Sequence, residues 1–532
     1  MARRVMTRTG VNALLAPIKQ EDRRLLIRPM LEETARQSPE RTAIIAGDVA
    51  ISYGQLADQV ARCAAGLLEL GLAAGDRVAV LLPNTMEFAT TLLAAHYAGL
   101  IAVPLFADYP PAEQRDILTQ TAARVLIASP SLLPLVPDES IPALTRVILT
   151  GVEAPGCLTY EALLESPPLG ASVDQDANGD PIAIIVYTSG STGRPKGVAH
   201  TQTRLVNRAD LFIQTLGITG SDRTLSAQHL GRPLFLVANL LAMLRVGGCL
   251  TLVDPPAPDR FWKCYGELQP TYYLAPPGYS YQLMDRPGAV QINHSRLRFW
   301  INVGDRPSAE LRQRVTAITG RPFLNMFGMT ESGFLAITSP TKPTKTDAIG
   351  KPMAGVEFQL VAPDGQEVAP GEAGRLRIRT PNLMVGYWND TLLTHRTIGS
   401  GWLETQDLLR IDEDGDYGFV GRRSDIIVRN GANVATALVV ESLLTHPAIA
   451  EAILVGMPDR CDGQLPMAFY RLRAAASDPG GAALHAWVAA VVDAWSIPAG
   501  FYPIDHWPLT PNGKIDRNRL IDMAAGLAAV AR

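Results

Sequence analysis

The sequence has few cysteines, and they form no recognisable pattern. Cys63, Cys157, Cys249, Cys264 and Cys461 are five in number and widely spaced, and no C-x-x-C motif occurs. An odd count with wide spacing disfavours a disulfide framework and favours reduced, mostly buried thiols in a cytoplasmic protein. None of the five has neighbours that indicate a catalytic nucleophile.

An excess of charge of one sign is also missing. The net charge is -4 over 532 residues, without a basic face or tail, so nothing favours nucleic-acid binding. The apolar stretches near residues 92–106 and 236–253 are too short or too interrupted to span a bilayer, so no membrane span is expected. No signal peptide is visible, and the early arginines Arg3, Arg4 and Arg8 only faintly resemble a transit peptide.

What the sequence does have is the composition of a globular enzyme, with 47% hydrophobic and 19% charged residues. Helix-like and strand-like runs alternate over residues 25–174, with helical periodicity at 55–71 and an apolar strand at 77–82. A similar rhythm recurs over residues 182–337. This alternation predicts an α/β protein whose large domain contains doubly wound, mostly parallel sheets.

The sequence pattern changes at two points in the remaining chain. After Lys345, glycines separate short strands, which predicts a small β-subdomain; within it, residues 412–416 predict a hairpin turn rather than a calcium loop. A break at residues 421–424 precedes a last segment with its own strands and helices, including a helix predicted over 484–495. We therefore expect a large N-terminal domain over residues 1–421 and a small, mobile α+β domain over residues 422–532.

The most informative segment, residues 187–198, reads Y-T-S-G-S-T-G-R-P-K-G-V and directly follows an apolar strand. Its glycines let backbone amides approach an anion, its hydroxyls add donors and its lysine adds a positive charge, so the loop predicts a phosphate cradle. It is not a Walker A motif, because the second glycine of that motif falls on Pro195. A plain Gly/Ser-rich surface loop is the alternative. The residues expected to hold phosphate are Thr188, Ser189, Gly190, Ser191, Thr192, Gly193 and Lys196.

Further motifs follow in a fixed order: N-M-F-G-M-T-E at residues 325–331, L-E-T-Q-D at 403–407, Gly421-Arg422, and L-T-P-N-G-K at 509–514. With the phosphate loop, they resemble the adenylate-forming superfamily of acyl-CoA synthetases, peptide-synthetase adenylation domains and luciferases. Acyl-CoA synthetases are the most similar members, and the resemblance covers nearly the whole chain. It implies that ATP activates a carboxylic acid as an acyl adenylate, with release of pyrophosphate, before a thiol takes the acyl group.

The resemblance also implies roles for individual residues. Lys514 would bridge the carboxylate and the α-phosphate, Thr330 would contact the α-phosphate, and Glu331 would bind Mg²⁺, which prefers oxygen ligands. Taken singly, Lys514 is better explained as an exposed turn lysine, Glu331 as a helix-start acid and Asp407 as a turn or cap residue, and only the shared order of the motifs reverses this. The further residues implied to bind ATP are Gly304, Asp305, Asn325, Phe327 at the adenine, Asp407 at the ribose, and Arg422.

The expected acyl pocket is mainly apolar, with His229, Val303, Gly328 and Phe334 in its wall. His229 is either a gate to the pocket or a buried core histidine. No aspartate occurs at residues 233–240 to bind an α-amino group, so a fatty or aryl acid is expected rather than an amino acid. Because no carrier segment is fused to the chain, coenzyme A is the expected acceptor, and a separate acyl carrier protein is the alternative.

Two departures from the family pattern concern the second half-reaction. The pivot of the small domain falls on Ser424, where relatives more often carry Asp or Lys. The usual G-x-x-[IV]-x-P-x-E reads G-A-N-V-A-T-A-L at residues 431–438, without the proline and the acid. These changes motivate the reading as a nucleotide-binding pseudoenzyme, which the intact Lys514 and Glu331 disfavour. A luciferase-like monooxygenase is a further alternative, and the sequence does not indicate an oligomeric state.

Overall fold

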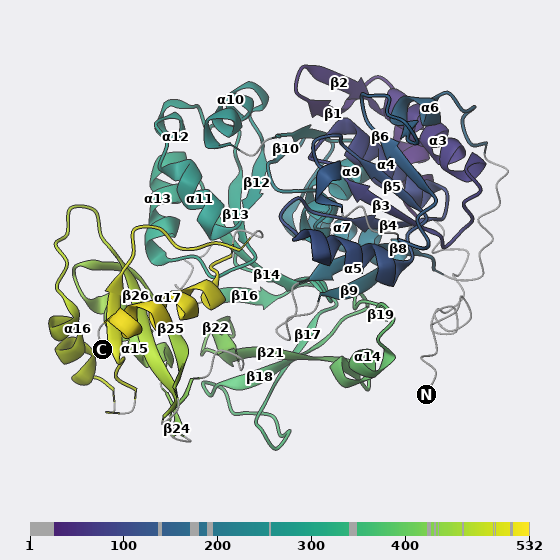
Figure 1. Ribbon diagram of the computed structural model, residues 1–532. Coiled ribbons are helices and arrows are strands. Elements are labelled where there is room, and N and C mark those ends of the chain that lie inside the picture. Colours follow the sequence, from purple (N-terminus) through teal and green to yellow (C-terminus); the bar gives the residue numbers. More distant parts are fainter. Residues whose placement is uncertain are drawn as a thin grey trace, which may run out of the picture.

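Two large β-sheets with helices on their faces make up most of the molecule, and a third, smaller sheet stands apart at the C-terminal end (Figure 1). The structure is a computed structural model, and it describes residues 26–136, 141–170, 180–188, 195–254, 257–339, 348–422, 427–429, 432–434, 436–459, 462–492, 494, 496–510 and 514–530. Among these residues, no helix is both long and apolar enough to cross a membrane.

The first sheet has eight strands in the order β19-β9-β8-β4-β3-β5-β6-β7. Its strands are β3 Arg77–Leu81, β4 Ile101–Pro104, β5 Val125–Ala128, β6 Arg146–Leu149, β7 Leu158–Thr159, β8 Ile182–Thr188, β9 Lys196–Thr201 and β19 Gly386–Tyr387. Strands β3 to β8 run parallel, whereas β9 is antiparallel to both β8 and β19. Strand β8 is apolar and buried along almost its whole length, as a strand covered on both faces must be.

The second sheet has fourteen strands, in the order β17-β18-β21-β22-β16-β15-β14-β13-β12-β10-β11-β1-β2, with β20 beside β21. Its strands are β1 Thr42–Ala46, β2 Val49–Ser52, β10 Arg223–Ser226, β11 Cys249–Leu252, β12 Tyr272–Ala275, β13 Phe299–Val303, β14 Phe323–Met329, β15 Gly333–Ile337, β16 Ala348–Pro352, β17 Glu357–Val361, β18 Gly374–Arg379, β20 Ile398–Gly399, β21 Trp402–Ile411 and β22 Tyr417–Arg422. The pairs from β1 through β11, β10, β12 and β13 to β14 are parallel. From β14 to β17 the described pairs are antiparallel.

Helices cover these sheets and enclose the main core between them. They are α2 Ile27–Gln37, α3 Tyr53–Glu69, α4 Met86–Tyr97, α5 Pro111–Thr121, α6 Tyr160–Leu164, α7 Gln202–Leu216, α8 Pro233–Phe235, α9 Ala242–Val246, α10 Pro258–Leu268, α11 Pro277–Met284, α12 Gly288–Gln291, α13 Ala309–Thr319 and α14 Thr391–Thr397. Local sequence sets their ends: Ser52 and Gln55 form a capping box at the start of α3, and Gly217 ends α7 in the left-handed conformation.

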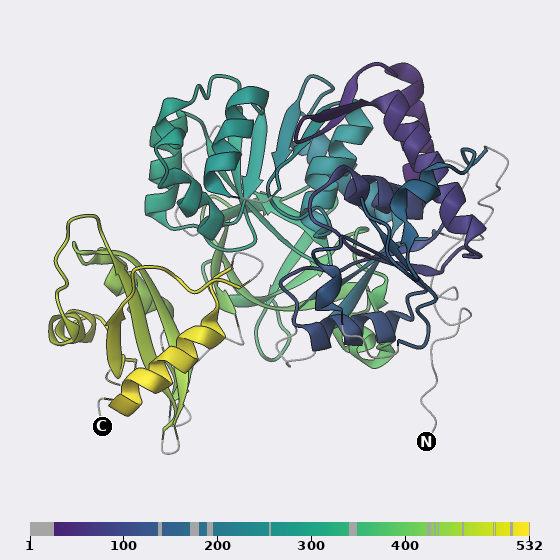
Figure 2. The ribbon, with the colours of Figure 1, turned by 45° about the horizontal axis from the view of Figure 1, so that its top comes forward.

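The small unit has its own sheet and its own two apolar clusters. Its elements are β23 Val428–Arg429, β24 Ala432–Asn433, α15 Thr436–Thr445, β25 Ile449–Asp459, β26 Gly463–Leu472, α16 Gly481–Ala489, β27 Gly500–Pro503 and α17 Arg517–Val530. The turned view in Figure 2 shows it beside the larger part rather than merged with it. The helix predicted over residues 484–495 is wrong at its end: α16 stops at Ala489, before the β-branched pair Val491 and Val492.

The α/β class and the hairpin at residues 412–416 are confirmed, since β21 and β22 pair across that turn. The division of the strands between the sheets differs from the sequence rhythm. The N-terminal β1 and β2 join the second sheet, and β8 and β9 join the first. The strands of the predicted β-subdomain continue the second sheet through the pairing of β15, β16 and β22. A strand at the edge of a sheet carries unpaired backbone N–H and C=O groups. The N-terminal strands and those of the β-subdomain supply hydrogen-bond partners for such groups at the two ends of the second sheet.

Gly350 is the point at which the chain turns closely against β15, and it yields a test of this packing. It has a φ of +86°, and a Cβ there would collide with the carbonyl group of Ile337. We expect Gly350→Ala to cost about 1–2 kcal/mol of stability for its backbone conformation and about 1–3 kcal/mol more for displacing β15. Gly355→Ala is the matched control, because Gly355 has a φ of +74° but open space around it. Thermal unfolding should show the larger loss for Gly350→Ala, and equal losses would contradict this account of the packing.

Candidate active site

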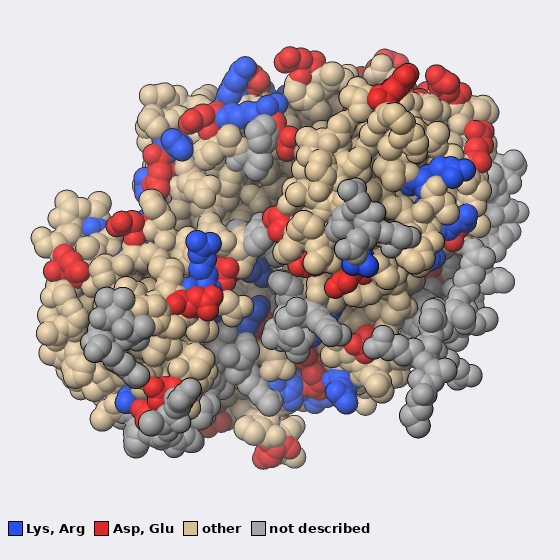
Figure 3. Space-filling model, in the orientation of Figure 1, with Lys and Arg blue, Asp and Glu red and all other residues tan. Residues whose placement is uncertain are grey.

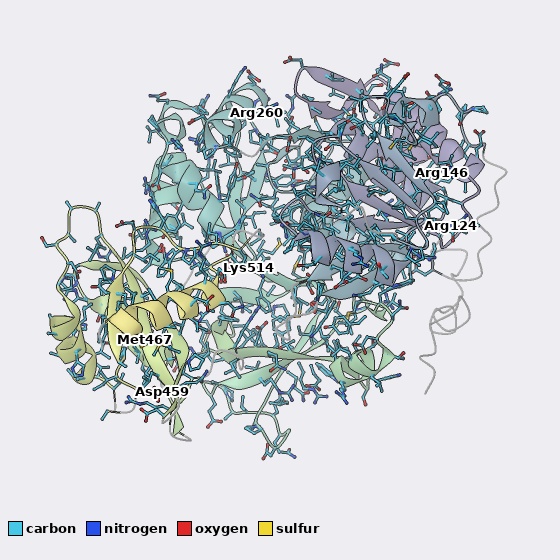
Figure 4. The ribbon with its side chains drawn as sticks, viewed as in Figure 1. Arg124, Arg146, Arg260, Asp459, Met467 and Lys514 are labelled. Atoms are coloured by element: carbon cyan, nitrogen blue, oxygen red, sulfur yellow. The ribbon has the colours of Figure 1, made fainter. Side chains whose placement is uncertain are left out.

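Lys514 projects from the small unit into the junction with the large part (Figure 4). The Thr510 backbone N–H donates to the Lys514 carbonyl oxygen at 2.7 Å, and the Lys514 N–H donates to the Thr510 hydroxyl at 3.3 Å. Its side chain extends to the end of β13, where a Cβ on Gly304 would lie 3.7 Å from the Lys514 Cε. The lysine is therefore packed against the large part at a residue that the sequence assigns to the nucleotide site.

Four other predicted site residues act electrostatically on Lys514. Burial lowers the pKa of its ammonium below the ordinary value of 10.5, and the Arg422 charge lowers it further. The carboxylates of Asp305, Asp407 and Glu331 raise it, without reversing the net shift. These residues follow β13 and β14 or lie on β21 and β22, so the fold gathers charges that are far apart in the sequence.

Asp407 and Arg422 face each other across the β21–β22 ladder. The Arg422 Nε donates to Asp407 Oδ1 at 2.9 Å, and the Asp407 backbone N–H donates to the Thr405 hydroxyl at 3.1 Å. The Asp407 side chain is 5% exposed and that of Arg422 is 50% exposed, so the carboxylate is fixed while the guanidinium faces solvent. A fixed carboxylate of this kind is suited to accept hydrogen bonds from two neighbouring hydroxyls.

Glu331 stands directly after the parallel pair β13 and β14, where ligands bind in open α/β sheets. The Tyr387 hydroxyl donates to Glu331 Oε1 at 2.9 Å, and the Lys196 ammonium lies 5.9 Å from the centre of the Tyr387 ring. Tyr387 thus connects the predicted metal ligand to the lysine of the phosphate loop. The sequence reasoning missed it, because its position depends on the pairing of β19 with β9.

Arg208 is a second residue that the sequence did not indicate. Its side chain is buried behind Gly333, and its Nη2 donates to the Asn382 carbonyl oxygen at 2.6 Å and lies 3.2 Å from His200 Nδ1. Burial lowers the pKa of Arg208 to about 9, whereas the Glu331 carboxylate raises it. The guanidinium therefore supplies positive charge beneath Glu331. In the sequence, Arg208 is simply one charged residue of the amphipathic helix α7, and no motif marks it.

A metal at Glu331 fits this site only together with a nucleotide. Within the described part of the chain, no group of three or more His, Cys, Asp or Glu side chains is placed to hold an ion. Mg²⁺ is commonly held by one or two carboxylates together with substrate phosphates and water. Glu331 therefore suits a magnesium ion that arrives with the nucleotide.

Two asparagines support the turn at Gly304 and Asp305, which is predicted to line the adenine opposite Phe327. Asn302 Nδ2 donates to Asn325 Oδ1 at 3.0 Å and to the Asp305 carbonyl oxygen at 2.8 Å, and Asn325 Nδ2 donates to the Ala348 carbonyl oxygen at 3.0 Å. Asn302 thus fastens the turn after β13, and Asn325 holds Asn302 in place. Phe327 lies with its ring centre 6.4 Å from those of two neighbouring aromatic residues, Phe358 and Phe419.

Three of the predicted acyl-pocket residues lie on adjacent strands. Val303 ends β13, and Gly328 on β14 pairs with Phe334 on β15. His229 lies elsewhere: its Nε2 is 2.8 Å from the Leu82 carbonyl oxygen, and its Nδ1 accepts from the Gly231 N–H at 3.1 Å. Burial lowers the pKa of His229 to about 4. Both ring nitrogens of His229 therefore have hydrogen-bond partners, and its role as a gate to the pocket stays a prediction.

The tip of the predicted phosphate cradle and the predicted pivot are not among the described residues. Ser189, Gly190, Ser191, Thr192, Gly193 and Ser424 all lie outside them. The two ends of the cradle are described: Thr188 on β8 is the register partner of Lys196 on β9. The Tyr109 hydroxyl donates to the Tyr187 carbonyl oxygen at 2.9 Å and supports the base of the loop.

The cationic side chains of Lys514, Arg422 and Lys196 concentrate positive charge where two anionic reactants have to meet, which lowers the barrier to joining a carboxylate and a phosphate. The fold and the site therefore define an ATP-dependent ligase that works through an acyl adenylate. The chain belongs to the family of AMP-binding enzymes: residues 31–388 match that family, and residues 440–514 match the AMP-binding enzyme C-terminal domain.

Individual relatives agree with this assignment. The chain is 30% identical over 484 residues to feruloyl-CoA synthase of Amycolatopsis sp, covering 90% of this chain and 95% of the relative. It is 29% identical over 482 residues to benzoate–CoA ligase of Thauera aromatica, covering 88% and 90%. The crystal structure of the anthranilate CoA ligase AuaEII in complex with anthranoyl-AMP matches with a TM-score of 0.84 and 26% identity, over 95% of this chain and 98% of that one.

Removing the Tyr387 hydroxyl tests its support of Glu331. A hydrogen bond to a charged group contributes about 1.5–3 kcal/mol, so we expect Tyr387→Phe to raise the Mg²⁺ concentration needed for half-maximal pyrophosphate release by about tenfold or more. Tyr470→Phe is the matched control, because the Tyr470 hydroxyl donates to Asp478 at 2.6 Å within the small unit. Identical magnesium titrations for the two variants would show that Tyr387 does not support Glu331.

The lowered pKa of Lys514 predicts an alkaline limb in the adenylation rate. The ammonium form is required, so the rate is full below the folded pKa of Lys514 and falls as pH rises through it, at a pH below 10.5. Arg422→Gln removes a charge that lowers this pKa, so the limb should move to higher pH even if the maximal rate falls. The check is a pH profile of acid-dependent pyrophosphate release, and a limb at the same pH in both proteins would exclude the lysine as its source.

Proposed function

We propose that the protein activates a hydrophobic carboxylic acid, aryl or fatty, with ATP and Mg²⁺, and then transfers the acyl group to coenzyme A. The observation that carries this proposal is the position of Lys514. It extends from the small unit to a site that contains Glu331, Asp305, Asp407 and Arg422, all four of which influence its pKa. A pseudoenzyme has no need to hold a charged lysine in such a buried place.

In the first half-reaction, a carboxylate oxygen attacks the α-phosphorus, and the bond to the β-phosphate oxygen breaks to release pyrophosphate. Lys514 balances the charge of both reactants, with Thr330 beside the α-phosphate and Asp407 on the ribose hydroxyls. Glu331 would hold a magnesium ion, which when bound would neutralise part of the charge on the triphosphate. In the second half-reaction, the thiol sulfur attacks the acyl carbonyl carbon, AMP leaves and the thiol proton is released.

The acid is assigned from the pocket and from the relatives. Val303 and Phe334 are 2% exposed apolar residues beside the site, and the sequence between residues 233 and 240 offers no aspartate for an amino group. The named relatives are ligases of ferulate, benzoate and anthranilate, and a medium-chain fatty-acid–CoA ligase of Escherichia coli is 28% identical over 466 residues. Because these relatives are CoA ligases, coenzyme A is preferred to a separate acyl carrier protein as the acceptor.

The division of labour along the chain belongs to the same proposal. Residues 1–421 would form the large domain with the ATP and acyl sites, and residues 422–532 a small domain that turns between the half-reactions about Ser424. The separate core of the small unit supports this division. A cytoplasmic location is proposed too, supported by the free thiols of Cys63, Cys157, Cys249 and Cys264.

The direct test of the function is pyrophosphate release over a panel of benzoic, cinnamic and straight-chain fatty acids, each with ATP and Mg²⁺. Mass analysis of the products with and without coenzyme A then identifies the adenylate and the thioester. We expect an acid-dependent release that does not need coenzyme A, and a thioester only when it is present. A separate carrier protein as acceptor would leave the adenylate unconverted with coenzyme A, and no release with any acid would overturn the proposal.

Lys514→Ala separates the two half-reactions. Loss of the bridging charge should reduce acid-dependent pyrophosphate release by roughly two orders of magnitude or more, whereas thioester formation from supplied acyl adenylate should be largely retained. Single-turnover assays of each step measure this difference. Adenylation by the variant at nearly the wild-type rate would remove Lys514 from the mechanism.

A further inference from the structure

One small group of side chains joins the two parts of the molecule away from the reacting centre. The Arg471 guanidinium, on β26 of the small unit, stands 5.3 Å from the centre of the Tyr281 ring, on α11 of the large part. On the small unit, Arg471 Nε donates to the Asp505 carbonyl oxygen at 3.1 Å, and Nη1 lies 3.4 Å from Glu451 Oε2. Arg471 is thus hydrogen-bonded within the small unit and lies over the face of an aromatic ring of the large part.

Glu451, on β25, completes this contact as a carboxylate that is only 8% exposed. The Trp507 indole N–H donates to its Oε2. Burial first, and then the Glu451 charge, raise the pKa of Tyr281, whose hydroxyl also bonds to the Ser308 hydroxyl at the start of α13. The large part therefore covers a charge that water would otherwise solvate.

The contact also secures the segment that carries Lys514. Asp505 and Trp507 lie between β27 and Lys514, and both are bonded to the Arg471–Glu451 pair. In Figure 1 the chain after β27 runs from the small unit toward the junction with the large part, where Figure 4 shows Lys514. A shift of the small unit relative to α11 would consequently move the base of the segment from which the lysine extends.

We propose that Tyr281, Arg471 and Glu451 act as an interdomain clamp, a set of positioning residues that holds the small unit where Lys514 serves adenylation. The clamp rests on the proposed function of Lys514. Its strength suits a contact that has to open in every cycle: a cation over an aromatic ring is a weak attraction, and a buried ion pair gains little net energy after desolvation. Such a clamp biases the equilibrium between two orientations without locking either.

Variants on both sides of the interface test the clamp in the full-length protein. Tyr281→Ala removes the ring, and Arg471→Gln removes the charge. Each should lower the single-turnover rate of adenylation by roughly three- to tenfold, with little change in the KM for ATP or acid, and together they should cost no more than the larger single effect. Transfer of the acyl group from supplied adenylate to coenzyme A should stay within about twofold of wild type or become faster, because that step needs the other orientation.

Tyr281→Phe is the conservative variant, since it keeps the ring and loses only the hydroxyl, and it should restore most of the adenylation rate. Arg379→Gln is the matched control: Arg379 stands 4.8 Å from the ring of Trp402, but both residues belong to the large part, so neither half-reaction should change. Equal slowing of both half-reactions by Tyr281→Ala, or fully additive effects with Arg471→Gln, would overturn the clamp.

Lys514→Ala separates this proposal from the function on which it rests. If Lys514→Ala abolishes adenylation and Tyr281→Ala has no effect, the clamp is wrong and the function stands. If Lys514→Ala leaves adenylation intact, Lys514 has no part in that step and the clamp falls with it, whereas the function itself is overturned only if the wild-type protein releases no pyrophosphate with any acid. When both proposals hold, adding Tyr281→Ala to Lys514→Ala should lower adenylation no further, because the clamp acts only through the lysine.

Discussion

Repulsion between two anions is the constraint on which this structure depends. A carboxylate and a triphosphate have to be brought into contact, and the positive charge that offsets their repulsion is that of Lys514, which lies near Glu331, Asp305 and Asp407. Burial and Arg422 oppose the charge of that lysine, and the three carboxylates sustain it. The sheets, the register of β21 on β22 and the position of the small unit all serve to keep these few groups within reach of one another.

The local parts of the site could be predicted from the sequence because each is a short pattern at the end of a strand. Gly304 and Thr330 directly follow apolar runs that become the parallel strands β13 and β14 and so lie at one edge of the second sheet, and Thr188 ends the apolar run that becomes β8 of the first sheet. Tyr387 and Arg208 could not be predicted in the same way. The first depends on a two-residue strand that pairs with β9, and the second on burial behind Gly333. The hydrogen bonds of the two His229 ring nitrogens, to the Leu82 carbonyl oxygen and the Gly231 N–H, likewise have no counterpart in a sequence pattern.

The class of the fold followed from the alternation of helices and strands, but the membership of each sheet did not. Hydrophobic periodicity fixes whether a strand is buried, whereas its neighbours are set by crossover connections and by which edge remains open. For this reason the sequence rhythm did not indicate that β1 and β2 join the second sheet. The small unit has apolar clusters of its own, and the domain boundary at residue 421 stays a prediction. On the face shown in Figure 3, acidic and basic side chains are interspersed, so charge marks no further division of the surface.

The joining of β19 to β9 has a consequence for how the protein is made. Gly386 and Tyr387 pair with Ala199 and Val198, nearly two hundred positions earlier in the chain. On the ribosome, the edge strand β9 of the first sheet consequently has no β19 to pair with until most of the second sheet has been synthesised. Glu331 lacks its hydrogen bond from Tyr387 until the same stage. The small unit emerges last, when the surface that it contacts is already complete. Synthesis from the N-terminus therefore yields the large part first and adds Lys514 after it.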